Sequence, residues 1–111
     1  MELNILRADP AGNITVFVLD PVEKAQRAAI AEKIMAIPAL KAEQVGYACT
    51  AEDDVDGHME MMGGEFCGNA TRAYGMYIAQ QKGGLSSVRL RVSGCDHVVT
   101  APCRFSDRPA R

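Results

Sequence analysis

The stretch that most constrains the fold is Ile14–Leu19, six consecutive residues that are nearly all apolar and rich in β-branched side chains. Such a run favours a β-strand, and its apolar side chains on both faces predict a strand that is buried on both. Asp9–Asn13 contains the residue types that turns need, and Leu3–Ala8 is a short, partly apolar segment before it. These features predict a hairpin whose second strand lies inside the protein.

Two segments have the spacing of apolar residues that is typical of helices. The first covers about residues 21–37, with Asp20 as the expected N-cap, Pro21 in the first helical position and Pro38 at the end. The second covers about residues 70–82 and ends at two consecutive glycines, Gly83 and Gly84. It carries no charge from Ala73 to Gln81, which predicts a helix enclosed by other elements.

The remaining apolar segments predict four further strands, over Gln44–Thr50, His58–Met61, Ser87–Val92 and His97–Ala101. Most connections are short, so we expect an α+β fold with an antiparallel or mixed sheet and helices packed on it. Residues 1–103 are expected to form a single domain, because 111 residues suffice for one hydrophobic core. The basic, aperiodic residues 104–111 are expected to be a frayed tail.

Charge and hydropathy exclude several classes of partner. The formal net charge is −2, which gives no reason to expect binding to nucleic acid or to an acidic membrane. The chain lacks an apolar run long enough to span a bilayer, and its first residues do not form a signal peptide. We therefore expect a cytoplasmic protein.

The chain has four cysteines, at positions 49, 67, 95 and 103. Without a secretory signal, reduced thiols are expected rather than disulfides. Cys49, Cys95 and Cys103 are interpreted as buried structural residues. No Cys-x-x-Cys pair occurs and the two histidines, His58 and His97, are not at ligand spacing, so the sequence predicts no metal site.

Cys67 stands apart because it follows the Gly63-Gly64 turn and directly precedes the second helix. The free N–H groups and positive end of a helix favour the thiolate, the reactive form of cysteine. The same N–H groups, here those of Gly68 and Asn69, can hold a carboxylate. We predict a reactive sulfur beside an anion cradle, in preference to an inert core thiol.

The residues around Cys67 resemble a known motif. Gly-Gly-Glu-Phe-Cys-Gly-Asn-Ala-Thr-Arg, residues 63–72, resembles the first catalytic motif of the diaminopimelate epimerases, and is closest to the branch that includes histidine racemases. Gly12-Asn13 with the segment through Asp20 resembles the N-terminal motif of that family. The resemblance implies a diaminopimelate epimerase-like domain, whose sheet wraps around the helix at about 70–82 with the helix at about 21–37 outside.

The resemblance also implies a function. Enzymes of this family racemise or epimerise amino acids without pyridoxal phosphate or a metal, so no cofactor is expected. One cysteine removes the α-proton and a second protonates the opposite face; Cys67 matches one of the two, as the base or the acid. Gly68, Asn69 and Asn13 match positions that contact the amino-acid substrate. The family's upstream asparagine is missing from His58–Met62, which argues against diaminopimelate itself as the substrate.

The second cysteine of the family comes from a second domain, and neither Cys95 nor Cys103 has the expected setting. We therefore expect the chain to be the N-terminal half of such an enzyme, needing a missing C-terminal domain or a second copy of itself. Two alternatives remain open. One is an isomerase of the phenazine-biosynthesis or proline-racemase type, and the other is a non-catalytic or self-pairing domain that binds small carboxylates.

Overall fold

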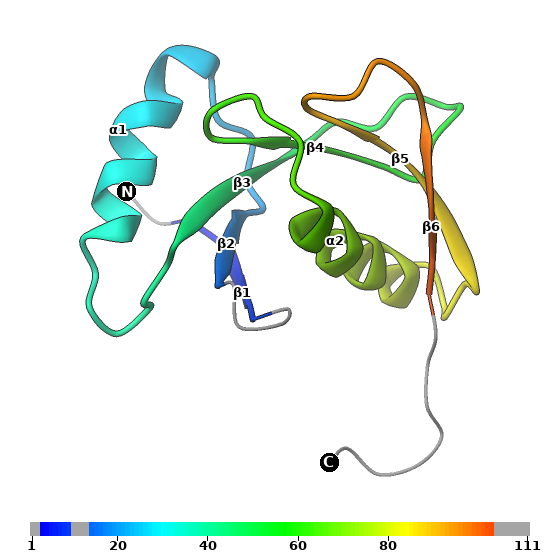
Figure 1. Cartoon of the computed structure of the whole chain (residues 1–111), viewed down its shortest axis with the longest axis horizontal. Helices are drawn as coiled ribbons and strands as arrows, with labels where there is room; N and C mark the ends of the chain where they lie inside the picture. Colours follow the sequence, from blue (N-terminus) through cyan, green and yellow to red (C-terminus); the bar gives the residue numbers. More distant parts are fainter. Residues whose placement is uncertain (1–2, 10–13, 104–111) are drawn as a thin grey trace, which may run out of the picture.

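Pairs of strands are separated by single helices in the described residues, 3–9 and 14–103, of the computed structural model (Figure 1). Their order is β1 (Ile5–Ala8), β2 (Thr15–Val18), α1 (Lys24–Met35), β3 (Gln44–Cys49), β4 (Gly57–Met61), α2 (Gly68–Gln81), β5 (Ser87–Val92) and β6 (Val99–Pro102). The predicted α+β class and the predicted order of elements are confirmed. The predicted turn at residues 10–13 and the predicted tail at 104–111 lie outside the described residues.

The six strands of this described part form one mixed sheet in chain order, β1 to β6. The β2–β3 and β4–β5 pairs are parallel, and the other three pairs are antiparallel. Each parallel pair is connected through a helix, and such crossovers are almost always right-handed. Because β4 and β5 run opposite to β2 and β3, the same handedness places α1 and α2 on opposite faces of the sheet.

The side chains of β2 are buried on both faces of the sheet, as predicted. Phe17 packs in the core beneath α2, whereas Val16 and Val18 pack in the core beneath α1, and all three are fully buried. The Phe17 ring lies 5.4 Å from that of Tyr74 in α2. Since α2 also packs on β5 and β6, the sheet curves around it, as predicted (Figure 1).

The first helix differs from its prediction at its start. It begins at Lys24, with Glu23 as N-cap and no side-chain capping hydrogen bond. The predicted cap, Asp20, instead accepts hydrogen bonds from the backbone N–H (2.6 Å) and side-chain amide (3.2 Å) of Asn4. A carboxylate that already ties the segment before β1 to the end of β2 is not available to cap the helix.

The apolar face of α1 is also narrower than its sequence indicates. Ile30, Ala31 and Ile34 are buried against the sheet. Ile37 was expected to continue this face, but the helix ends at Met35 and Ile37 is 45% exposed. The buried part of the helix therefore spans only about one and a half turns.

The second helix agrees closely with its prediction. It ends at Gln81, and Gly83 and Gly84 follow with φ angles of 88° and 89°. The Gly84 N–H donates to the Ala79 carbonyl (2.7 Å), which satisfies a carbonyl of the last turn. No helix in the described part of the chain has the length and hydropathy needed to cross a membrane.

Candidate active site

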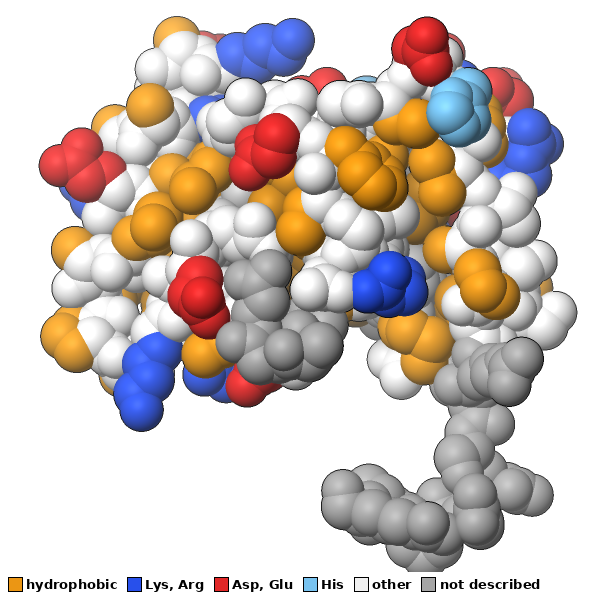
Figure 2. Space-filling model, in the orientation of Figure 1, with side chains coloured by type: hydrophobic (Ala, Val, Ile, Leu, Met, Phe, Trp, Pro, Cys, Tyr) orange, Lys and Arg blue, Asp and Glu red, His pale blue; other side chains and the backbone are white. Residues whose placement is uncertain are grey.

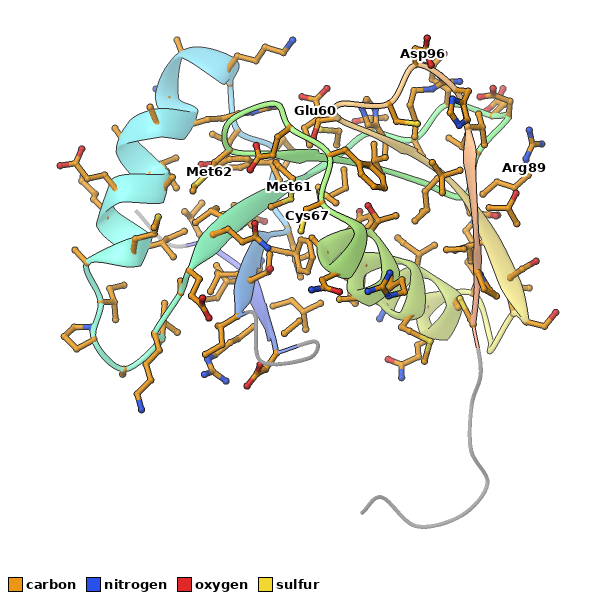
Figure 3. The ribbon with its side chains drawn as sticks, viewed as in Figure 1. Glu60, Met61, Met62, Cys67, Arg89 and Asp96 are labelled. Atoms are coloured by element: carbon orange, nitrogen blue, oxygen red, sulfur yellow. The ribbon has the colours of Figure 1, made fainter. Side chains whose placement is uncertain are left out.

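Cys67 is the N-cap residue of α2, on the face of the sheet that the helix covers (Figure 3). Its backbone is extended (φ −131°, ψ 112°), and helical geometry begins at Gly68. The Cys67 carbonyl accepts hydrogen bonds from the backbone N–H (2.9 Å) and the hydroxyl (2.8 Å) of Thr71. Thr71 is buried, so these two bonds fix the half-buried cysteine to the first turn of the helix.

The backbone N–H groups of the predicted anion cradle belong to the residues that directly follow Cys67. The N–H groups of Gly68, Asn69 and Ala70 precede the first intrahelical hydrogen bond, which the Thr71 N–H makes. The positive end of the helix dipole adds to their attraction for a carboxylate. The Asn69 side-chain oxygen accepts a hydrogen bond from the exposed Arg72, which holds the amide against the helix.

A residue that the sequence analysis did not select also contacts the sulfur. The Gln44 side-chain amide lies 3.2 Å from Cys67 Sγ and donates to the hydroxyl of buried Thr15 at 2.9 Å. Gln44 and Thr15 are register partners at the start of the parallel pair β3–β2. An amide donor held in this way stabilises negative charge on the sulfur. No local sequence signal connects Gln44 with a cysteine 23 residues later.

The segment before Cys67 is held from the β5–β6 turn. The Ser93 hydroxyl donates to the Glu65 carbonyl (2.7 Å) and accepts from the Met61 N–H (2.8 Å). Gly94 has a φ of 75°, and a Cβ there would lie 2.3 Å from the Phe66 backbone nitrogen. Glycine is therefore required at position 94 for the β5–β6 turn to approach the loop that carries the cysteine.

The other cysteines agree only in part with their prediction. Cys103 is buried, as expected, and burial raises the pKa of its thiol. Cys49 and Cys95 were predicted to be buried, but both are only partly buried. Cys49 is the last residue of β3, and Cys95 lies in the turn between β5 and β6. The structure thus brings together Cys67, Gly68 and Asn69, whereas the predicted substrate contact Asn13 lies outside the described residues.

The visible face around the site carries apolar side chains and scattered single charges rather than a patch of one sign (Figure 2). Phe66, immediately before the cysteine, is 48% exposed. Such a surface suits a small substrate or an apolar contact better than a polyanion.

Comparison with known proteins identifies the family of this domain. Residues 2–109 match the family model described as "Histidine racemase CntK N-terminal domain". The chain belongs to this family. Curated relatives named histidine racemase include one from Staphylococcus aureus, 36% identical over 95 residues, and one from Fusobacterium nucleatum subsp. nucleatum, 42% identical over 79 residues.

These matches cover 82% and 69% of the chain, but 34% and 27% of the two relatives. The chain thus corresponds to the N-terminal portion of a histidine racemase and spans about a third or less of its relatives' length. The predicted resemblance to the diaminopimelate epimerase-like racemases, and to their histidine racemase branch in particular, is confirmed.

Proposed function

We propose that this domain supplies one of the two proton-transfer groups of a cofactor-independent histidine racemase, and that this group is the Cys67 thiol. The observation that carries the proposal is the position of Cys67. It directly precedes the free N–H groups of α2, and its sulfur contacts the side-chain amide of Gln44. Histidine is the proposed substrate because the relatives carry the name histidine racemase.

In this mechanism the substrate carboxylate binds at the N–H groups of Gly68 and Asn69. The Cys67 thiolate takes the α-proton, and the electron pair of the broken C–H bond remains on the α-carbon and its carboxylate. The α-proton is only weakly acidic, so this developing charge must be stabilised, and the fixed N–H dipoles at the start of α2 are suited to do so. A second thiol then donates its proton to the opposite face of the carbon, which inverts the centre.

The second thiol is proposed to come from a C-terminal domain. The curated relatives extend well beyond the matched region. In the described part of the chain, neither Cys49, Cys95 nor Cys103 makes a hydrogen bond that places it at the Cys67 site. A second copy of the chain is the alternative source of this thiol. Catalytic thiols must stay reduced, which favours the cytoplasm as the place of action.

The test is exchange of the histidine α-proton in deuterium oxide, with the two enantiomers followed by chiral chromatography. The domain is assayed alone and joined to the C-terminal domain. We expect turnover by the joined protein, and loss on the order of 10³-fold in Cys67→Ser, since general acid–base groups contribute 10² to 10⁴. Cys95→Ser is the matched control and should retain activity. Unchanged exchange in Cys67→Ser would refute the role of Cys67.

A further inference from the structure

Three side chains with ligand atoms of different types lie close together on the face of the sheet that α1 covers, opposite the face of Cys67. Cys49 of β3 and His58 of β4 are register partners, and Glu60 follows His58 by two residues on the same face. The Cys49 sulfur, a His58 ring nitrogen and a Glu60 carboxylate oxygen all lie within 4.8 Å of one another, and all three residues are partly buried. Figure 3 shows Glu60 on β4.

We propose that Cys49, His58 and Glu60 form a binding site for one divalent transition-metal ion, with Zn²⁺ as the best fit. Sulfur, imidazole nitrogen and carboxylate oxygen are the ligands that zinc uses in proteins. A three-residue set leaves a fourth position for water. This inference is independent of the proposed racemase function, because the site lies on the other face of the sheet from Cys67.

The spacing of two of the ligand atoms already fits a tetrahedral ion. His58 Nε2 and Glu60 Oε2 are 3.3 Å apart. With metal–nitrogen and metal–oxygen bonds of about 2.1 Å, a tetrahedral angle separates the two ligand atoms by about 3.4 Å. The third ligand atom, Cys49 Sγ, lies within 4.8 Å of the other two, and the strand register places Cys49 opposite His58.

Arg27 of α1 sets the orientation of the carboxylate. Its guanidinium contacts Glu60 Oε1 at 2.5 Å, which leaves Oε2 turned toward His58. The same guanidinium lies 3.7 Å from Cys49 Sγ and 5.2 Å from the centre of the Tyr47 ring. Hydrogen-bonded partners of this kind orient metal ligands in known sites.

Arg27 also provides the positive charge of the cluster when no metal is bound. A divalent ion brings two charges, and the Cys49 thiol must lose its proton to bind it. Thiolate and carboxylate together then neutralise the ion, and the guanidinium keeps its contact with Oε1 while withdrawing from the sulfur. Metal binding therefore releases a proton from Cys49.

This cluster has no local sequence signal, because its ligand residues are not at the fixed spacing of known zinc motifs. Cys49 and His58 are separated by an acidic loop, and pairing of β3 with β4 is needed to place them side by side. Glu60 has the ordinary appearance of the polar face of a half-buried strand.

The test is titration of the metal-free 111-residue chain with CoCl₂ and, separately, ZnCl₂. We expect one Co²⁺ per chain with a sulfur-to-cobalt absorption band in the near ultraviolet, displacement of that band by Zn²⁺, and proton release on binding. Cys49→Ser should abolish the band. His58→Ala should weaken affinity by more than the roughly 10- to 100-fold typical of losing an outer-sphere partner.

The matched controls are Cys67→Ser and Cys95→Ser, which should leave the band unchanged. Cys95 is an informative control because its sulfur lies 3.5 Å from the ring nitrogens of His97. Glu60→Gln keeps the shape of the side chain and should weaken binding without unfolding the chain. A band that survives Cys49→Ser, a band that disappears in Cys95→Ser, or no cobalt binding at all would overturn the proposal.

Discussion

The two faces of the sheet each present a half-buried cysteine beside a nitrogen donor, yet the two sulfurs have different surroundings. On the α1 face, Cys49 lies near the Arg27 guanidinium, but burial, first, and the Glu60 carboxylate, second, raise the pKa of its thiol more than Arg27 lowers it. On the α2 face, Cys67 contacts a neutral amide at the start of a helix. The Arg27 charge therefore does not bring the pKa of the Cys49 thiol below its ordinary value, because burial and the Glu60 carboxylate oppose it.

The two faces also differ in how the backbone near each sulfur is held. The loop before Cys67 is fixed by Ser93 and by the close approach of Gly94. The backbone of Cys49 is held instead by the pairing of β3 with β4, and its sulfur contacts the Arg27 guanidinium and the Tyr47 carbonyl. The position of Cys67 thus depends on loop contacts, whereas that of Cys49 depends on the sheet.

The largest expected effect on stability comes from Gly94→Ala. The new Cβ would approach the Phe66 backbone to 2.3 Å at a φ of 75°, so we expect a loss of about 2–4 kcal/mol in the free energy of unfolding. Urea unfolding measures this loss, and alkylation of Cys67 should change with it while that of Cys49 does not.

Gly84→Ala is the matched control for this substitution. Its φ of 89° is equally unfavourable for alanine, but a Cβ there would meet nothing within 4 Å. We expect a smaller loss, about 1–2 kcal/mol from the backbone conformation alone. Equal losses at the two positions would show that the close approach of Gly94 to the loop before Cys67 does not contribute to the free energy of unfolding.

A smaller effect is expected at alkaline pH, and it again differs between the two faces. Burial raises the pKa of Tyr74, in the core beneath α2, to about 12. Since the unfolded chain ionises this tyrosine near pH 10, its contribution is fully present below pH 10 and is lost as the pH rises toward 12. The loss is on the order of 2 kcal/mol.

Tyr47, beneath α1, also has a raised pKa because of burial, but there the Arg27 charge lowers the pKa in part. Tyr74→Phe should therefore remove more of the alkaline destabilisation than Tyr47→Phe does. The measurement is the midpoint of urea unfolding at several values between pH 9 and 12. A larger effect of Tyr47→Phe would contradict the view that the Arg27 charge offsets part of the rise in the Tyr47 pKa.

Several features of this fold follow from local patterns in the sequence. The apolar run around Phe17 predicts a strand buried on both faces, and the Gly-Gly turn before Cys67 predicts the start of a helix. Both elements are confirmed, whereas the reactivity of the Cys67 sulfur stays a prediction. They depend on neighbouring residues alone, such as the alternation of side chains along β2 and the glycines after α2.

Features that depend on distant pairing were missed. Gln44 reaches Cys67 because the crossover through α1 places β3 beside β2. The helix α2, with Cys67 at its start, then packs on the face of the sheet opposite α1. Asp20 resembles a helix cap, but Asn4 across the hairpin competes for its carboxylate. In each case a residue's partner lies 16 or more positions away, so local propensity cannot identify it.

The measurement that tests the central claim most directly is the rate of thiol alkylation at each cysteine of the same sample. Iodoacetamide labelling near pH 7, read by mass spectrometry of the peptides, compares Cys67 with Cys49 in the protein joined to its proposed second domain. We predict that Cys67 reacts at least about tenfold faster than Cys49, and that histidine protects Cys67 alone. Labelling of Cys49 at the same or a higher rate, with no protection of Cys67 by histidine, would contradict the assignment of proton transfer to the α2 face.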